Sequence, residues 1–222
     1  MTDGIKEALG IQSCSVKRKF FSRRNAVYHM CAQQRNGTAS EFVYKQYISG
    51  SIKNEYETLI KMQGKSVPQV LAKDEKSLCL EYLRGETLLE CLEKTELSEQ
   101  TFEAYIDGLL SFLEKFYTTV PGLIYGDVNL RNFIMTPGGL CGVDMEESCP
   151  GSIAADIGRA AAFILRYRPE GTQYKIKTAE YLTRRSSVFF GIPVQEIEHE
   201  KQAELAAMQK RRQHTGEANG KS

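Results

Sequence analysis

The stretch 125-YGDVNLRN-132, followed closely by 142-GVDME-146, decides more about this chain than any other part of its sequence. It places an acid, Asp127, five positions before an amide, Asn132, and a second acid, Asp144, after a short apolar run. Phosphoryl transfer from a magnesium-bound nucleotide needs a carboxylate that accepts a hydroxyl proton, and a carboxylate and an amide oxygen that hold the metal. The pattern therefore predicts a catalytic loop that is followed by a metal-binding aspartate.

The spacing matches the H-R-D-x-x-x-x-N and D-F-G signals of kinases. In that match Asp127 is the candidate catalytic base, and Asn132 and Asp144 are the candidate magnesium ligands. Tyr125 stands where kinases have a histidine. An Asp and an Asn five positions apart often occur by chance, so the interpretation depends on the residues upstream.

An upstream segment supplies a candidate phosphate-binding lysine. Residues 41–47 alternate like a half-buried strand and contain Lys45. In kinases a third-strand lysine holds the α- and β-phosphates and pairs with a glutamate on the next helix. The predicted helix over residues 54–62 offers Glu55 as this partner, with Glu57 as the alternative. Taken singly, a surface lysine and a solvated helical glutamate would be the plainer explanation.

Residues 78–88 combine an apolar strand, an acidic and aromatic step, a glycine and the start of a helix. We interpret this segment as a hinge between two lobes. Glu81 to Leu83 would offer backbone groups to adenine, and Leu80 would line the pocket behind it. Any α+β protein has a strand, a turn and a helix, so the interpretation depends on the position between the lysine strand and the catalytic loop.

Four segments together resemble the aminoglycoside phosphotransferase and choline kinase-like branch of the protein-kinase-like superfamily. They are LEYLRGETL at 80–88, YGDVNLRNF at 125–133, GVDMEES at 142–148 and GSIAADIG at 151–158, within a similarity over about residues 14–166. The resemblance implies ATP and Mg²⁺ as cofactors. It also implies that Asp156 braces the catalytic loop through backbone hydrogen bonds; the alternative is an ordinary first-turn acid that interacts with the helix dipole.

The sequence departs from protein kinases in two places. Residues 20–26 contain no glycine where protein kinases have a G-x-G-x-x-G loop, and Ser22, with Arg23 and Asn25, is the candidate substitute for phosphate binding. Glu146 replaces the glycine of D-F-G, and the eleven residues before Asp156 leave no room for an activation loop. These departures disfavour a regulated protein kinase.

The composition is typical of a cytoplasmic enzyme. The chain has 222 residues, of which 41% are hydrophobic, and a net charge of +1 that does not favour nucleic acid or a membrane surface. Its six cysteines show no C-x-x-C spacing, which argues against a zinc site or a disulfide framework and favours reduced thiols. We find no secretory signal and no apolar run of membrane-spanning length.

We expect an α+β protein with a two-lobed, protein-kinase-like fold. The first lobe, residues 1–83, should hold a small antiparallel sheet and one helix, and the second, residues 84–222, should be mainly helical. The expected strands cover 14–20, 26–32, 42–48 and 78–83, and a turn at 137–139 joins two short strands. The expected later helices cover 98–117, 154–166, 175–190 and a solvated, fraying segment at 196–214, with a disordered tail from about 215.

The expected function is transfer of the γ-phosphate of ATP to a hydroxyl of a small molecule. Glu146 and Glu147 would favour a cationic acceptor. One alternative is a compact atypical protein kinase or ATPase that acts with a protein partner, similar to the small kinase of the tRNA threonylcarbamoylation machinery. Another is a nucleotide-binding pseudokinase regulator, which Tyr125 and the missing glycine loop favour. The basic residues 210–212 offer a contact for a protein or nucleic-acid partner.

Overall fold

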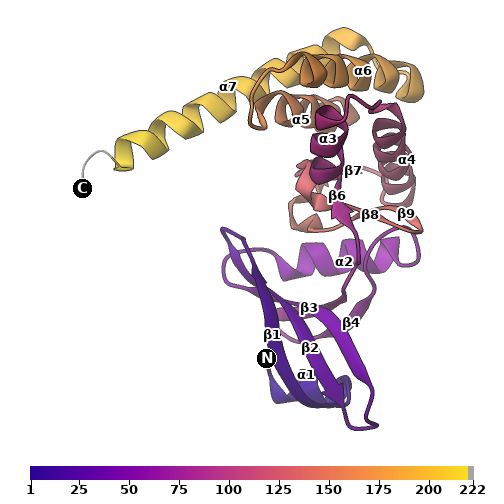
Figure 1. The fold of residues 1–222 in the computed structure, drawn as a ribbon, viewed down its shortest axis with the longest axis vertical. Helices are drawn as coiled ribbons and strands as arrows, with labels where there is room; N and C mark the ends of the chain where they lie inside the picture. Colours follow the sequence, from indigo (N-terminus) through magenta and orange to yellow (C-terminus); the bar gives the residue numbers. More distant parts are fainter. Residues whose placement is uncertain (220–222) are drawn as a thin grey trace.

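The computed structural model describes the backbone of residues 1–219 and the side chains of residues 1–213. It shows an α+β protein in which an N-terminal five-stranded antiparallel sheet is followed by a mainly helical C-terminal region. In Figure 1 the sheet forms one end of the molecule, the helices form the other, and α2 (Ile52–Met62) lies between them.

The sheet has the strand order β1-β2-β3-β5-β4, with antiparallel pairing throughout. Its strands are β1 (Ile11–Phe20), β2 (Asn25–Gln34), β3 (Ala39–Tyr47), β4 (Val70–Lys73) and β5 (Ser77–Glu81). Four of them match the predicted strands within a few residues, whereas β4 and the short helix α1 (Asp3–Ala8) were not predicted. Met30, Phe42 and Tyr44 form a small core with Ile5 of α1 on one face of the sheet.

Helix α2 begins two residues before its predicted start because Ser51 caps it, with its side chain accepting a hydrogen bond from the Asn54 backbone N–H at 3.2 Å. Leu59 and Met62 are buried as their spacing predicted. Glu55 is also buried, so the apolar side of α2 carries one carboxylate into the interior.

The C-terminal region begins after the segment that follows β5. It contains β6 (Glu86–Thr87), α3 (Leu88–Leu97), α4 (Glu103–Thr119), β7 (Leu123–Ile124), the 3₁₀ turn η1 (Leu130–Asn132), β8 (Phe133–Thr136), β9 (Gly139–Gly142), the 3₁₀ turn η2 (Met145–Glu147), β10 (Cys149–Pro150), α5 (Ile153–Arg166), α6 (Gln173–Phe190) and α7 (Val194–Asn219). The β8–β9 hairpin turns at the predicted Pro-Gly-Gly.

Helix α4 supplies the centre of the main core through Ile106, Leu109, Leu113 and Phe116, all of which are fully buried. Their helical spacing predicted this arrangement. The predicted start at residue 98 is wrong, because α3 continues to Leu97 and residues 98–102 form the turn between the two helices.

Helix α7 differs from the expected solvated segment. Its first half packs against α5: Ile197 is fully buried, Lys201 is largely buried, and a Cβ on Gly158 of α5 would lie 2.6 Å from Cβ of Glu200. Met208, just past the midpoint, is also largely buried. In Figure 1 the second half of α7 projects beyond the other helices. The backbone is helical to Asn219, where the predicted disordered tail should already have begun, and the rest of that tail lies outside the described residues.

No helix in the part of the chain that the structure describes has both the length and the apolar character needed to cross a membrane.

Candidate active site

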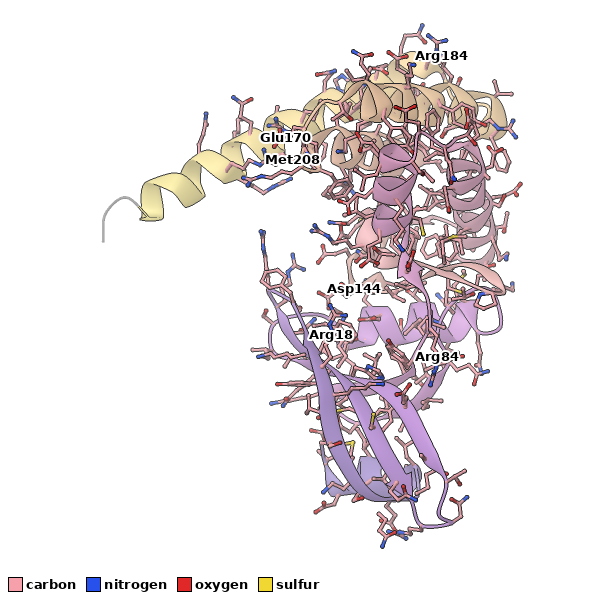
Figure 2. All side chains as sticks on the ribbon, viewed as in Figure 1. Arg18, Arg84, Asp144, Glu170, Arg184 and Met208 are labelled. Carbon is pink, nitrogen blue, oxygen red and sulfur yellow. The ribbon has the colours of Figure 1, made fainter. Side chains whose placement is uncertain are left out.

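A buried lysine lies among three carboxylates where the sheet meets α2 and η2. Nζ of Lys45 is 2.6 Å from Oε2 of Glu55, 2.5 Å from Oδ1 of Asp144 and 3.3 Å from Oε2 of Glu146. The Lys45 side chain is only 5% exposed, and Figure 2 places Asp144 next to α2. The structure thus brings Lys45 together with its predicted partner Glu55 and with the predicted metal ligand Asp144.

The charges in this cluster are arranged so that the lysine stays protonated. Burial alone would lower the pKa of Lys45, but the negative charges of Glu55, Asp144 and Glu146 outweigh it and hold this pKa above its ordinary value. Burial raises the pKa of Glu55, and the neighbouring ammonium of Lys45 opposes that rise. The Tyr47 hydroxyl also donates a hydrogen bond to Oε2 of Glu55, which fixes the carboxylate from a second side.

Asp144 adopts a backbone conformation that is unusual for a residue with a side chain. Its φ and ψ angles are 64° and 60°, in the left-handed region that disfavours a Cβ atom. The preceding residue is tied to the neighbouring loop, because Val143 N–H donates to the Asn132 carbonyl at 2.8 Å. Outliers of this kind persist where the surrounding structure enforces them, and they concentrate at functional sites.

The predicted base and the predicted amide ligand face one another across the 125–132 loop. Nδ2 of Asn132 donates to Oδ2 of Asp127 at 3.1 Å and to the Asp127 carbonyl at 3.0 Å. The amide oxygen of Asn132 takes part in neither bond. Burial raises the pKa of Asp127, and the hydrogen bond from Asn132 opposes the rise. Asn132 therefore fixes the orientation of the Asp127 carboxylate.

Asp156 of α5 braces the same loop. One carboxylate oxygen accepts hydrogen bonds from Tyr125 N–H at 2.6 Å and from the Tyr117 hydroxyl at 2.9 Å, and the other accepts from Gly126 N–H at 2.9 Å. Asp156 is 0% exposed, and burial raises its pKa against the effect of these donors. Of the two explanations left open by the sequence, the geometry supports the brace.

Gly126 allows the braced loop to approach η2 closely. Its φ is 88°, and a Cβ at this position would lie 2.2 Å from the carbonyl oxygen of Glu147. Any other residue would therefore push apart the loop that carries Asp127 and the turn that follows Asp144.

Tyr125 joins the same two segments from inside the core. Its hydroxyl donates to the Val143 carbonyl and lies 3.4 Å from the Asn132 carbonyl. Its ring packs against Phe116 and Phe133, with centroids at 5.4 and 5.1 Å. The residue that departs from the kinase pattern is thus a fully buried structural link.

The β1–β2 turn, residues 21–24, is attached to this site through Asn25. Nδ2 of Asn25 donates to Oε2 of Glu146 at 2.6 Å, and Arg24 forms an ion pair with Glu147. The predicted phosphate-binding residue Ser22 lies on the turn, where its hydroxyl accepts a hydrogen bond from Asn25 N–H at 3.1 Å. The structure brings the turn to the site, although the Ser22 hydroxyl stabilises the turn itself.

The predicted adenine-binding residues lie further along the sheet. Leu78 of β5 pairs with Lys45, and Glu81 lies three residues later, or about 10 Å along the strand. Oε2 of Glu81 accepts a hydrogen bond from Gln69 N–H at 3.2 Å. Leu83 follows on the segment between β5 and β6. The structure therefore places Glu81 at the end of β5 and Leu83 on the connection between the sheet and the helical region.

The oxygen atoms present at the site suit a hard divalent cation. Oxygens of Glu55, Asp144 and Glu146 all lie within 4.8 Å of one another, and Mg²⁺ prefers carboxylate and amide oxygen ligands. The predicted ligand pair was Asn132 and Asp144. Two other carboxylates join Asp144 in the structure. Glu55 was predicted as the partner of Lys45, and Glu146 was predicted to contact the acceptor.

Sequence reasoning missed several polar contacts. Asn54 donates through Nδ2 to the carbonyls of Glu146 and Ser148 at 2.7 and 2.8 Å, and nothing in its sequence context signals this. Tyr47 could have been found, because it is two positions after Lys45 on the same side of the strand. Glu146 and Glu147, the residues expected to favour a cationic acceptor, form ion pairs with Lys45 and Arg24 in the structure.

No protein-family model matches this chain, and no curated protein matches its sequence. The functional argument therefore depends on the geometry of the site.

Proposed function

We propose that the chain has a two-lobed protein-kinase-like fold and is an ATP- and Mg²⁺-dependent phosphotransferase that acts on a hydroxyl group. The observation that carries the proposal is the position of Lys45, whose ammonium contacts Glu55 of α2 and Asp144 of the segment after β9. The lysine and the glutamate come from neighbouring elements and the aspartate from a distant segment, and their meeting supports a role in phosphoryl transfer from a nucleotide.

In this proposal Lys45 neutralises charge on the nucleotide phosphates, and Glu55 and Tyr47 keep its side chain in place. Asp144 and the amide oxygen of Asn132 would hold the magnesium, which supplies neutralisation of phosphate charge when it is bound. Asp127 accepts the proton of the acceptor hydroxyl, and its hydrogen bond to Asn132 fixes the accepting carboxylate. Positioning and electrostatic stabilisation would supply most of the rate.

A small-molecule acceptor is favoured by the short segment between Asp144 and Asp156. This segment forms η2 and β10, and Cys149 of β10 pairs with Ile124 of β7. This leaves no long loop on which an extended peptide could lie. We therefore propose a hydroxyl-bearing small molecule as the substrate class.

The test is ATP turnover by the purified chain, measured across a panel of hydroxyl-bearing metabolites with Mg²⁺ and with chelator. Lys45→Met should abolish turnover, whereas Lys53→Met, which removes an exposed lysine of α2, should leave it unchanged. Nucleotide binding without turnover for any acceptor would favour the pseudokinase regulator. Equal turnover in the two lysine variants would refute the proposed role of Lys45.

A partner-dependent kinase or ATPase is the second candidate, and the projecting half of α7 favours it. This half carries the basic residues 210–212, and Arg212 is also paired with Glu170 at 2.5 Å. Truncation after Gln209 keeps the buried Ile197 and Met208 and removes the basic residues. Loss of all turnover on this truncation, with an unchanged melting temperature, would favour the partner-dependent enzyme over the small-molecule kinase.

A further inference from the structure

A second group of ligand-type side chains lies on the same face of the sheet as Lys45. Glu41 is four residues before Lys45 on β3, so the two side chains point to the same face. Cys31 of β2 pairs directly with Glu41, and His29 is two residues earlier on β2. These three residues, the His29–Cys31–Glu41 cluster, have no part in the proposed phosphotransfer site.

The donor atoms of the cluster converge. Nε2 of His29 is 3.7 Å from Oε2 of Glu41, and Sγ of Cys31 is 3.7 Å from Oε1 of Glu41. All three donors lie within 4.8 Å of one another. In a tetrahedral site with bond lengths of 2.0 to 2.3 Å, donors are separated by roughly 3.3 to 3.8 Å. Small side-chain rotations would therefore place the three donors around one ion.

His29 provides a second, independent observation that points to a ligand. It is 4% exposed, and the ring of Tyr82 stacks on it with centroids 3.7 Å apart. Among the residues whose side chains the structure describes, none forms a hydrogen bond with the buried Nε2 of His29, and its distance to Glu41 is too long for one. Buried polar atoms are nearly always paired, so this nitrogen indicates a partner that the protein itself does not supply.

We propose that His29, Cys31 and Glu41 form a binding site for a borderline-soft divalent cation of the Zn²⁺ class. This differs from the expectation drawn from the cysteine spacing, because the site takes only one cysteine. An imidazole nitrogen, a thiolate and a carboxylate are the ligand types of zinc, and three protein ligands leave a fourth position for water. A thiolate does not suit Mg²⁺, so the site is chemically distinct from the oxygen cluster around Asp144. On binding, Cys31 loses its thiol proton to solvent as the sulfur–metal bond forms.

Two cations near Glu41 compete with the metal. Lys17 and Arg84 each lie 2.7 Å from a Glu41 carboxylate oxygen. Their side chains are 55% and 79% exposed, and Figure 2 labels Arg84 near the sheet. Because exposed ion pairs contribute little, both side chains can turn into solvent when a divalent ion binds.

The experiment is a titration of the metal-free full chain with Zn²⁺ by calorimetry and with Co²⁺ by absorption spectroscopy, in the presence of excess Mg²⁺. We expect one ion per chain, and a sulfur-to-cobalt charge-transfer band. Loss of a residue that only contacts a metal ligand lowers metal affinity about 10- to 100-fold. Cys31→Ser and His29→Gln remove ligands themselves, so each should lower the affinity for Zn²⁺ by more than this. Cys149→Ser, which alters an exposed cysteine, should have no effect.

Wild-type protein that takes up no Zn²⁺, or that shows no charge-transfer band with Co²⁺, would overturn the proposal without any variant. Equal affinities for wild type, Cys31→Ser and His29→Gln would also overturn it, provided that the variants melt cooperatively. These outcomes are independent of ATP turnover, so the metal site and the phosphotransferase can fail separately.

Discussion

Replacing Asp156 by asparagine tests whether this residue braces the 125–132 loop. The change keeps the size of the side chain and converts one carboxylate oxygen into an NH₂ group. In the wild type, Tyr125 N–H and Gly126 N–H donate to separate carboxylate oxygens at 2.6 and 2.9 Å. In the variant, the single remaining oxygen can accept from only one of these two positions. The Tyr117 hydroxyl can rotate and accept from the new NH₂ group. At least one buried backbone donor therefore loses its acceptor.

The two explanations of Asp156 predict different losses of stability. A hydrogen bond to a charged group contributes about 1.5–3 kcal/mol, so the brace predicts a fall of that size in the free energy of unfolding. Interaction with the helix dipole alone predicts a loss of about 0.3–1 kcal/mol at an exposed position and of at most about 2 kcal/mol at a partly buried one. Glu196→Gln, which changes an exposed first-turn acid of α7, is the matched control and should alter stability little.

Urea unfolding at pH 7, followed by circular dichroism, measures this difference. In thermal unfolding, the loss of stability that the brace predicts would lower the Tm of a chain of this size by roughly 3–12 °C, at about 2–4 °C per kcal/mol. A loss for Asp156→Asn that equals the loss for Glu196→Gln would refute the brace. Turnover should fall together with stability, because the braced loop carries Asp127.

Three further outcomes are expected. Asp127→Asn should lower turnover about 10²- to 10⁴-fold with little change in ATP affinity, as measured by steady-state kinetics and calorimetry; near-normal turnover would exclude a base at this position. Asp144→Ala should weaken ATP binding much more with Mg²⁺ than with chelator, and equal losses would indicate a structural role. Asp127 must be ionised to act as the base, and burial raises its pKa. On acidification kcat/KM should therefore begin to fall at a higher pH than it would with an ordinary aspartate, and Asp127→Asn should remove this acidic fall from the pH profile.

Local patterns in the sequence predicted much of the fold. Alternation over residues 41–47 correctly predicted β3, the strand that contains Lys45, and helical spacing from Ile106 to Phe116 correctly predicted the central helix. The ion pair between Lys45 and Glu55 was also predicted, from the kinase pattern in which a third-strand lysine pairs with a glutamate on the next helix.

Contacts between distant segments were harder to predict. The burial of Ile197 depends on Gly158, which lets α7 approach α5, and the few apolar residues of a charge-rich segment give no such signal. The contact of Glu146 with Lys45 and Asn25 likewise depends on how three separate elements meet. Asp156 could be assigned to one of its two explanations only when the backbone donors near it were known.

Tyr125 has a consequence for how the site responds to acidity. A histidine at this position could gain or lose a proton near neutral pH, and the connection between the two loops would then carry a variable charge. Burial raises the pKa of Tyr125 well above its ordinary value, so its hydroxyl remains neutral wherever the protein is folded. The Tyr125 side chain, which links the Asp127 loop to the Asp144 segment, therefore carries no charge that varies with pH. Protons taken up where these two segments meet must bind to the carboxylates.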